Sequence, residues 1–426
     1  MNSLLRIPYA LAGHLAHALA RVAPAGESKL RRGLNARRGI VGRYERWSST
    51  SRVPARPLVW FHAPSVGEGL QAQPVIELLR TRRPDVQIAY TFYSPSAEQF
   101  ARSLNVDFAD YLPFDTYADA DKIIAALAPS ALVFSKLDIW PVLTEQAASA
   151  HIPVGVISAT LAETSGRRGL FARALLSDAY RAIECVGAID ATDAGHFREL
   201  GVRPERVRVT GDTRYDQVWT RAQREASALV QSMRSSRPTL VAGSTWRADE
   251  VHLFSAWSKI RDKIPDARLV IAPHELTAAH IASGESWARS RDLRLARIDA
   301  RDAPDADVVL VDRFGILGDL YALADVAYVG GGFHSAGLHS VLEPAAFGAP
   351  VLFGPRNDRS RDAAKLIEAG GGAVVTGEAD LSLRLSDWLG SLAARDSAGA
   401  AARSMVQTGV GAAERSFELV SALLDR

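Results

Sequence analysis

Short apolar runs rich in β-branched side chains recur roughly every 20–30 residues along this chain. Amphipathic stretches of helical length separate them, and this alternation is typical of a doubly wound α/β domain with a parallel sheet. In the first half of the chain, strands are predicted at residues 57–61, 86–93, 131–134, 153–157, 186–189 and 207–210. A second series is predicted at residues 239–242, 268–272, 308–311, 326–329, 350–353 and 373–375. The pattern therefore predicts two domains of the same design.

A polar, strand-free stretch between the two series predicts one long helix and a connector. A chain of 426 residues with 47% apolar content can bury two cores, because single cores seldom grow beyond about 250–300 residues. We expect Rossmann-like domains at residues 51–215 and 238–392, joined by a connector at residues 216–237. A basic segment at residues 1–50 precedes them, and a helical segment at residues 393–426 follows.

Basic charge is concentrated at the N-terminus. The net charge is only +2, yet residues 1–56 carry eleven Lys and Arg against two acids. Leu11, Leu15 and Leu19 share one side of a helical wheel there, and an Arg-rich stretch follows, which is typical of an interfacial helix with a polybasic segment. Arg6 and Pro8 interrupt the apolar stretch and disfavour a membrane span. We expect docking on an anionic membrane surface; the alternatives are a solvated helix packed on the protein's own core, and nucleic-acid binding.

The first candidate site follows the first predicted strand. Ser65 and Glu68 stand at the start of a helical pattern, beside the carboxyl edge of the expected sheet, where α/β proteins bind ligands. Ser-x-x-Glu is also a capping box, in which both side chains satisfy backbone donors. The alternative is that Glu68 acts as a general base on an acceptor hydroxyl. His62, at the strand end, either approaches a substrate or makes structural hydrogen bonds.

The second candidate site is a glycine-rich run after the strand at residues 326–329. The glycines at residues 330–332 and at 337 give backbone amides room to approach a phosphate. Residues 340–343 then repeat the Ser-x-x-Glu pattern, so Glu343 is either part of a cap or an acceptor for ribose hydroxyls. Two further strand ends, at residues 243–245 and 273–275, should converge on the same edge.

Several classes of site are disfavoured. The glycine spacing matches neither a dinucleotide fingerprint nor a Walker loop, and the histidines lack the spacing of a zinc protease motif. A single cysteine, Cys185, excludes an intrachain disulfide and a thiolate metal cluster, which fits a reducing cytoplasm. We therefore expect neither a metal nor another cofactor. Arg214, at a predicted strand end, can bind an anionic sugar or pair with Asp212 or Asp216.

Together these stretches resemble the Kdo transferases, which move 3-deoxy-D-manno-octulosonic acid (Kdo) from CMP-Kdo to the lipid A precursor. The likeness extends from about residue 58 to residue 372, and its specificity lies in the joint order of the motifs. The motifs that carry it are residues 65–68, 140–141, 209–216, 242–246, 272–275, 330–344 and 353–355.

The resemblance implies a GT-B fold, with two Rossmann-like domains facing an interdomain cleft, and an inverting transfer without a required metal. It places Glu68 at the catalytic base and Arg214 at a position that stabilises the transition state. Many family members have two acids before the Trp-Pro pair; this chain has Lys136 and Asp138, and we include both among the catalytic candidates. With the strand-end residues above, the predicted CMP-binding set is Ser244, Thr245, Pro273, His274, Gly315, Ile316, Leu317, Gly331, Gly332, Ser340, Val341, Leu342 and Glu343.

The expected function is therefore Kdo transfer to the lipid A precursor (lipid IVA) during lipopolysaccharide assembly. The expected location is the cytoplasmic face of the bacterial inner membrane, with CMP-Kdo, the lipid precursor and the anionic membrane surface as partners and no nucleic acid. One alternative is a GT-B transferase that uses another nucleotide sugar. A second is a non-catalytic, membrane-bound nucleotide-binding module.

Overall fold

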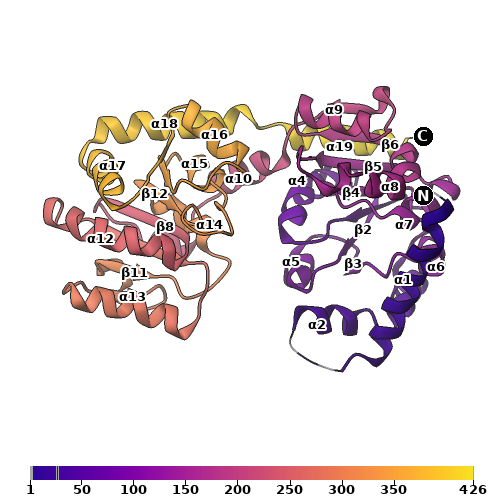
Figure 1. Ribbon diagram of the computed structural model, residues 1–426, viewed down its shortest axis with the longest axis horizontal. Helices are drawn as coiled ribbons and strands as arrows, with labels where there is room; N and C mark the ends of the chain where they lie inside the picture. Colours follow the sequence, from indigo (N-terminus) through magenta and orange to yellow (C-terminus); the bar gives the residue numbers. More distant parts are fainter. Residues whose placement is uncertain (1–2, 25, 27, 426) are drawn as a thin grey trace. The chain divides into compact units, whose positions relative to one another are not determined.

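The computed structural model describes residues 3–24, 26 and 28–425, and the chain forms two compact domains (Figure 1). The N-terminal domain consists of Met1–Gln217 together with Val410–Arg426, and the C-terminal domain consists of Val218–Gly409. The predicted terminal helical segment is therefore divided. Its first helix, α18 (Leu392–Thr408), belongs to the C-terminal domain, and α19 (Ala412–Leu424) belongs to the N-terminal domain.

The N-terminal domain is built on a parallel sheet of seven strands in the order β3-β2-β1-β4-β5-β6-β7. The order reverses between β1 and β4, and ligands bind at such a switch point in doubly wound sheets. The strands are β1 (Leu58–His62), β2 (Gln87–Phe92), β3 (Phe108–Tyr111), β4 (Ala131–Ser135), β5 (Val154–Ala159), β6 (Ile183–Ala188) and β7 (Val207–Val209).

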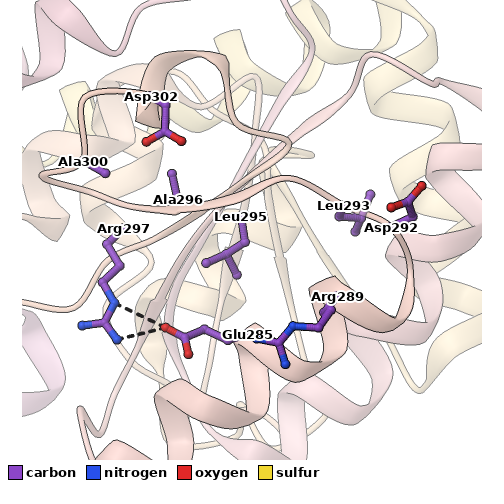
Figure 2. Close-up of a pocket in the computed structure, with 9 residues that line it drawn as sticks. All are labelled: Glu285, Arg289, Asp292, Leu293, Leu295, Ala296, Arg297, Ala300 and Asp302. Carbon is purple, nitrogen blue, oxygen red and sulfur yellow. Dashed lines mark hydrogen bonds and ion pairs between the residues drawn. The ribbon is translucent and has the colours of Figure 1, made fainter.

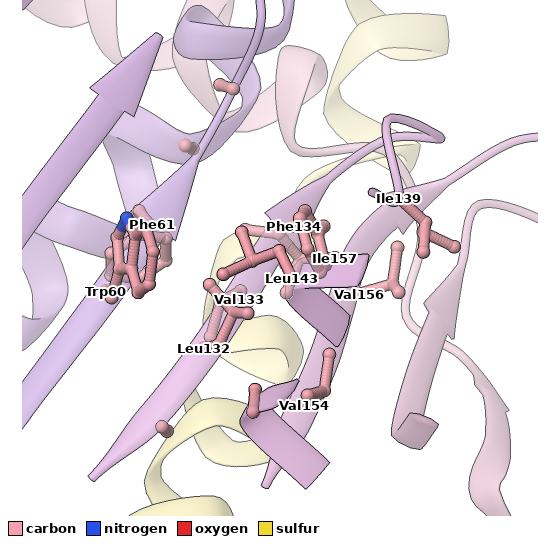
Figure 3. Packing of buried hydrophobic residues seen from close by; sticks show 14 of the residues in the cluster. Trp60, Phe61, Leu132, Val133, Phe134, Ile139, Leu143, Val154, Val156 and Ile157 are labelled. Carbon is pink, nitrogen blue, oxygen red and sulfur yellow. The ribbon is translucent and has the colours of Figure 1, made fainter. Parts of the chain in front are cut away.

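Central strands of this sheet are buried on both faces, which explains their continuous apolar sequences. Trp60 and Phe61 of β1 and Val133 and Phe134 of β4 are fully buried and contribute to one core (Figure 3). The helices of this domain are α1 (Ser3–Val22), α2 (Lys29–Ala36), α3 (Ile40–Ser51), α4 (Val66–Arg82), α5 (Glu98–Ser103), α6 (Tyr117–Leu127), α7 (Pro141–Ser149), α8 (Leu170–Ala182) and α9 (Ala191–Glu199), with α19 packed against α4 and β5.

The C-terminal domain repeats the design with the order β10-β11-β9-β8-β12-β13-β14. Its strands are β8 (Thr239–Thr245), β9 (Arg268–Pro273), β10 (Leu295–Arg297), β11 (Val308–Leu310), β12 (Val326–Val329), β13 (Val351–Phe353) and β14 (Gly372–Val374). Its main helices are α12 (Arg247–Lys263), α13 (Ala278–Ser290), α14 (Leu317–Leu320), α15 (Leu342–Ala346), α16 (Arg361–Glu368), α17 (Glu378–Gly390) and α18. The predicted fold of two doubly wound α/β domains is confirmed.

Two details of the prediction are wrong. The connector holds two helices, α10 (Thr213–Gln223) and α11 (Ala228–Ser232), where one long helix was expected. The edge strands β3 and β10 were missed, because Asp110 interrupts the four residues of β3 and Arg297 ends the three residues of β10, so neither has a continuous apolar run. Among the helices that the structure describes, none is both long and apolar enough to span a bilayer.

Candidate active site

Glu68 lies in the first turn of α4, directly after the switch-point strand β1. Ser65 precedes the helix, but its hydroxyl donates to the Glu68 carboxylate and does not cap the backbone, so the capping-box interpretation is wrong here. Lys136 Nζ donates to Glu68 Oε1 at 3.1 Å, and the Glu68 side chain is 18% exposed. Burial alone would raise the pKa of Glu68, but the Ser65 hydroxyl and the Lys136 ammonium outweigh it and lower that pKa. The carboxylate is thus ionised at neutral pH, as a general base must be.

Asp138 lies beside this pair, in the loop between β4 and α7. Trp140 Nε1 donates to its Oδ2 at 3.0 Å, and Arg167 Nη2 donates to its Oδ1 at 3.2 Å. His62 Nε2 lies 3.4 Å from Oδ2, and its Nδ1 contacts the Thr91 hydroxyl at 2.9 Å. Burial would raise the pKa of Asp138, but His62 and Arg167 lower it. The fully buried His62 therefore has the structural role, and Asp138 is held by its neighbours.

Arg214 stands at the start of α10, after β7. Its Nε and Nη2 both donate to Asp212 Oδ2, at 2.9 and 2.6 Å. Asp216 instead accepts from the backbone amides of Gly411 and Ala413 at the start of α19. The predicted pairing with Asp212 is confirmed. Because the Arg214 side chain is 37% exposed, the guanidinium keeps a surface that can meet an anion.

The glycine run of the C-terminal domain is organised by Asp249, a fully buried residue of α12. Its carboxylate accepts from the amides of Gly331 at 2.8 Å and Phe333 at 3.1 Å, and from the Tyr328 hydroxyl at 3.0 Å. A Cβ on Gly331, whose φ is +93°, would lie 2.1 Å from the Gly337 carbonyl oxygen. The glycines therefore allow backbone to pack on backbone. The expectation that the Gly331 amide approaches a phosphate is wrong, because Asp249 already occupies it.

Two residues of the predicted CMP set end β8 with different surroundings. Ser244 is partly exposed and adopts a φ of +54°. Thr245 is fully buried, and its hydroxyl donates to Glu250 Oε1 at 2.7 Å. The other Glu250 oxygen lies 2.8 Å from His280 Nε2. Thr245 thus supports the strand end, and Ser244 is the residue with access to solvent.

A stack of aromatic rings lies beside the glycine run. The Trp246 ring stacks with His334, with 3.9 Å between centroids, and with His274, with 4.3 Å. His339 packs against His274 at 4.6 Å, and its Nε2 accepts from Trp246 Nε1 at 3.2 Å. Burial and the neighbouring His274 lower the pKa of His339. Of these rings the predicted CMP-binding set contains only His274, with Pro273 before it, and the structure packs the other three rings around it.

The second Ser-x-x-Glu pattern does not form a capping box either. The N-cap residue of α15 is Val341, and Ser340 before it is exposed. Glu343 instead accepts from Arg221 Nη1 at 3.1 Å. Burial raises the pKa of Glu343, while Arg221 opposes that shift. Leu342 is fully buried and fixes the helix on the core.

The remaining predicted donor residues lie in the turn that leads into α14. Gly315 has a φ of +91°, a conformation that L side chains rarely adopt. Ile316 is the N-cap residue of α14, and Leu317 begins the helix. A Cβ on Gly243, at the end of β8, would lie 2.9 Å from the Leu317 side chain, so this turn packs against the strand that carries Ser244. A Cβ on Gly332 would collide with the backbone of Gly354, so Gly332 serves close packing.

A separate pocket of about 620 Å³ lies at the β10 edge of this domain (Figure 2). Arg297 donates to Glu285 across it at 2.9 Å. None of the predicted site residues lines it. Within the described residues, no three metal-ligating side chains are grouped as a metal site requires. The lining residues are Glu285, Arg289, Asp292, Leu293, Leu295, Ala296, Arg297, Ala300 and Asp302.

Comparison with known proteins finds a family model and relatives that this chain resembles. Residues 34–217 match the family model of the 3-deoxy-D-manno-octulosonic-acid transferases (kdotransferases). The 3-deoxy-D-manno-octulosonic acid transferase of Haemophilus influenzae is 25% identical over 397 residues, which cover 92% of this chain and 92% of that protein. The enzyme of the same name from Bordetella pertussis is 26% identical and covers 88% of this chain and 90% of its own.

Solved structures agree on the fold. The UDP-GlcNAc 2-epimerase of Neisseria meningitidis superposes with a TM-score of 0.62 at 15% identity, covering 87% of this chain and 100% of that chain. A glycosyltransferase of Rickettsia africae superposes with a TM-score of 0.56 at 11% identity, covering 87% of this chain and 99% of that chain. The protein is a glycosyltransferase with the GT-B fold. The resemblance to the Kdo transferases drawn from the sequence motifs is confirmed, by the family model over residues 34–217 and by the named relatives along most of the chain.

Proposed function

We propose that the protein transfers Kdo from CMP-Kdo to the lipid A precursor (lipid IVA), with inversion at the anomeric carbon. The observation that carries the proposal is the ionised Glu68 carboxylate, held by Lys136 at the switch point of the N-terminal sheet. Relatives along most of the chain are named as transferases of this sugar, which supports the choice of donor.

The chemistry follows from the charges that develop. The acceptor hydroxyl oxygen forms a bond to the anomeric carbon, and Glu68 takes the hydroxyl proton. The bond from that carbon to the CMP phosphate breaks, and its electron pair leaves with CMP. Arg214, paired with Asp212 yet partly exposed, supplies positive charge toward the anionic groups. We assign acceptor activation to the N-terminal domain and donor binding to the Ser244, His274 and Glu343 region of the C-terminal domain.

The test is an assay of the full-length protein with CMP-Kdo and the lipid A precursor in detergent. It measures the release of CMP and the mass of the product. We expect a mass gain of Kdo units that depends on both substrates. UDP-N-acetylglucosamine and other nucleotide sugars in parallel reactions test the alternative donor. Turnover of one of these in place of CMP-Kdo would overturn the assignment, and nucleotide binding without turnover of any would favour the non-catalytic module.

We further propose that α1 docks the protein on the cytoplasmic face of the bacterial inner membrane. Its outer stripe is apolar and exposed: Ile7 is 71% exposed, Leu11 63% and Leu15 61%. Its inner face is fixed to the domain by Tyr9, which donates to Asp115, and by His17, 2.6 Å from Asp119. An apolar stripe of this kind inserts at the level of lipid headgroups.

The basic residues near α1 fall into two groups. Lys29, Arg31 and Arg32 are exposed and can contact anionic headgroups. Arg37 is buried and donates to the carbonyls of Gly33, Leu112 and Tyr93, and Arg43 pairs with Asp110. The expectation that the whole Arg-rich segment is free for a membrane is therefore wrong for these last two.

Co-sedimentation with phosphatidylethanolamine vesicles, with and without phosphatidylglycerol, tests the docking. We expect binding that depends on the anionic lipid and is lost in a Leu11→Ser, Leu15→Ser variant. The equally exposed Leu383 and Leu392 of the C-terminal domain provide the matched control, Leu383→Ser, Leu392→Ser. An equal loss of vesicle binding in both variants would contradict the proposal. Binding to RNA in preference to the vesicles would also contradict it.

A further inference from the structure

Within the part of the chain that the structure describes, the carboxylate of Glu343 pairs with one cation, Arg221 of the connector helix. Arg221 lies in the last turn of α10, within the part of that helix that belongs to the C-terminal domain. Its Nη1 donates to Glu343 Oε1 at 3.1 Å, and its Nε lies 3.6 Å from Asp319 Oδ1. Both the Arg221 and Glu343 side chains are only about a quarter exposed. The pair therefore lies largely out of solvent, where an ion pair is weakly screened.

The fold provides space for this guanidinium. A Cβ on Gly318, a buried residue of α14, would lie 1.9 Å from Arg221 Nη1 and 3.0 Å from Glu343 Oε1. The φ of Gly318 is outside the left-handed region, so the position requires space and not a special backbone conformation. The end of α10 is also fixed by Trp219, whose ring lies 5.1 Å from the Arg403 guanidinium carbon of α18. Arg221 thus occupies a prepared site.

The surroundings of Glu343 show why it needs this partner. Burial raises the pKa of Glu343 and Asp319 raises it further, so Arg221 alone favours the ionised form. Across the described residues, no other side chain donates a hydrogen bond to this carboxylate, and Oε2 is left available. An ionised carboxylate accepts hydrogen bonds from two hydroxyls, whereas a protonated one loses part of that capacity.

We propose that Arg221 is a positioning residue of the donor site, which holds the Glu343 carboxylate ionised and oriented to accept hydrogen bonds from the ribose hydroxyls of a cytidine nucleotide. The inference rests on the proposed function, because it takes the donor to be CMP-Kdo. It adds a residue of the connector helix to a site otherwise built from strand ends and turns of the C-terminal sheet. Asp319 is 49% exposed and lies beside the same guanidinium. Its negative charge partly offsets the stabilisation that Arg221 gives to the ionised Glu343 carboxylate.

Calorimetric titration of CMP into the full-length protein between pH 5 and 9 tests the proposal. In Arg221→Met we expect CMP affinity at neutral pH to fall about ten-fold or more, because a charge-assisted network is broken. Binding requires ionised Glu343, so it is lost as the pH falls through the pKa of that group. Without Arg221 the loss should begin about one pH unit higher. Arg221→Lys should restore most of the affinity and the position of the pH profile.

Gly318→Ala gives a second variant that moves the guanidinium without removing its charge. We expect the CMP affinity of Gly318→Ala to lie between those of wild type and Arg221→Met. Gly284→Ala is the matched glycine control, because a Cβ there meets nothing within 4 Å. Arg297→Met, at an exposed ion pair of the same domain, controls for the loss of an arginine.

The outcomes are distinguishable. Wild-type protein that binds no CMP overturns the proposed function and this inference with it. If wild type binds CMP and Arg221→Met binds it equally with the same pH profile, only the inference is overturned. Weaker binding with an unshifted profile and no recovery in Arg221→Lys also overturns it, because that pattern is what a purely structural contact would give.

Discussion

The two Ser-x-x-Glu stretches follow strands at corresponding edges of the two sheets, yet the pKa values of their glutamates are shifted in opposite directions. Glu68 receives hydrogen bonds from Ser65 and Lys136, and its pKa is lowered despite burial. Among the described residues, only Arg221 donates a side-chain hydrogen bond to Glu343, and the pKa of Glu343 is raised because the effect of burial exceeds that of Arg221. One sequence pattern thus gives a ready proton acceptor in one domain and a carboxylate that depends on a single partner in the other.

The difference teaches that the neighbours fix the chemistry of a short motif. In each domain the decisive cation comes from another element: Lys136 from the end of β4 and Arg221 from α10. The pattern alone predicts the same capping box twice, and the structure forms it at neither position. Variants that change the surroundings of one glutamate and not of the other therefore test this difference between the two motifs. Their expected effects range from a large loss of turnover to a small change in stability.

Glu68→Gln should lower kcat by about 10²–10⁴-fold, because the amide cannot accept the proton of the acceptor hydroxyl. CMP affinity should be unchanged, since the predicted donor residues lie in the other domain. The measurement is steady-state Kdo transfer together with CMP titration. Glu77→Gln on the same helix is the control. A Glu68→Gln variant that retains more than a tenth of the activity would remove Glu68 from the role of base.

Asp249→Ala should destabilise the C-terminal domain by about 3 kcal/mol, because it leaves the buried amides of Gly331 and Phe333 and the Tyr328 hydroxyl without an acceptor. Urea unfolding measures the free energy. The exposed Asp262 on the same helix gives the control, Asp262→Ala, which should stay within about 0.5 kcal/mol. A result for Asp249→Ala as small as for the control would show that the glycine run is stable without this carboxylate.

Lys136→Met should raise the pKa of Glu68. Burial raises this pKa and the Lys136 ammonium lowers it, so removing the ammonium leaves more of the effect of burial. Only ionised Glu68 accepts a proton, so activity is present above its pKa and lost as the pH falls through it. The acidic limb of the kcat/KM profile should therefore move up by about one pH unit, with little change above pH 8. Lys136→Arg should keep the wild-type profile. An acidic limb that does not move would mean that Lys136 has no influence on the base.

The parts of this protein that sequence reasoning could reach are those with local signals. The strands β1, β4 and β8 each contain a continuous apolar run because both faces of the sheet are covered there, and they were placed within a few residues. Glu68 could be found because it follows β1, and Arg214 could be found because it follows the strand predicted at residues 207–210. The strands β3 and β10 could not, because each is short and carries a charged residue that breaks the apolar run.

Long-range partners explain what the sequence missed in the site. Asp249 binds an amide 82 residues later, and Arg221 binds a carboxylate 122 residues later. No spacing rule links positions so far apart, and only the fold brings them together. A weak signal did exist for Asp249. An acid three residues after the N-cap residue is typical of a side chain that accepts a hydrogen bond from the backbone amide of that N-cap residue. The interaction with Trp246 that this predicts is present.

Ser340→Ala gives the smallest expected effect and the sharpest separation between motif and environment. Because Val341 begins α15 and Ser340 is exposed, removing the hydroxyl should change the free energy of unfolding by less than about 0.5 kcal/mol. A true capping serine would cost about 0.5–2 kcal/mol. Ser65→Ala provides the contrast, because its hydroxyl is bonded to Glu68 and its loss should raise the pKa of that base. A stability loss at Ser340 within the capping range, measured by urea unfolding, would return the second motif to the role of a cap and weaken the argument that Glu343 is reserved for a ligand.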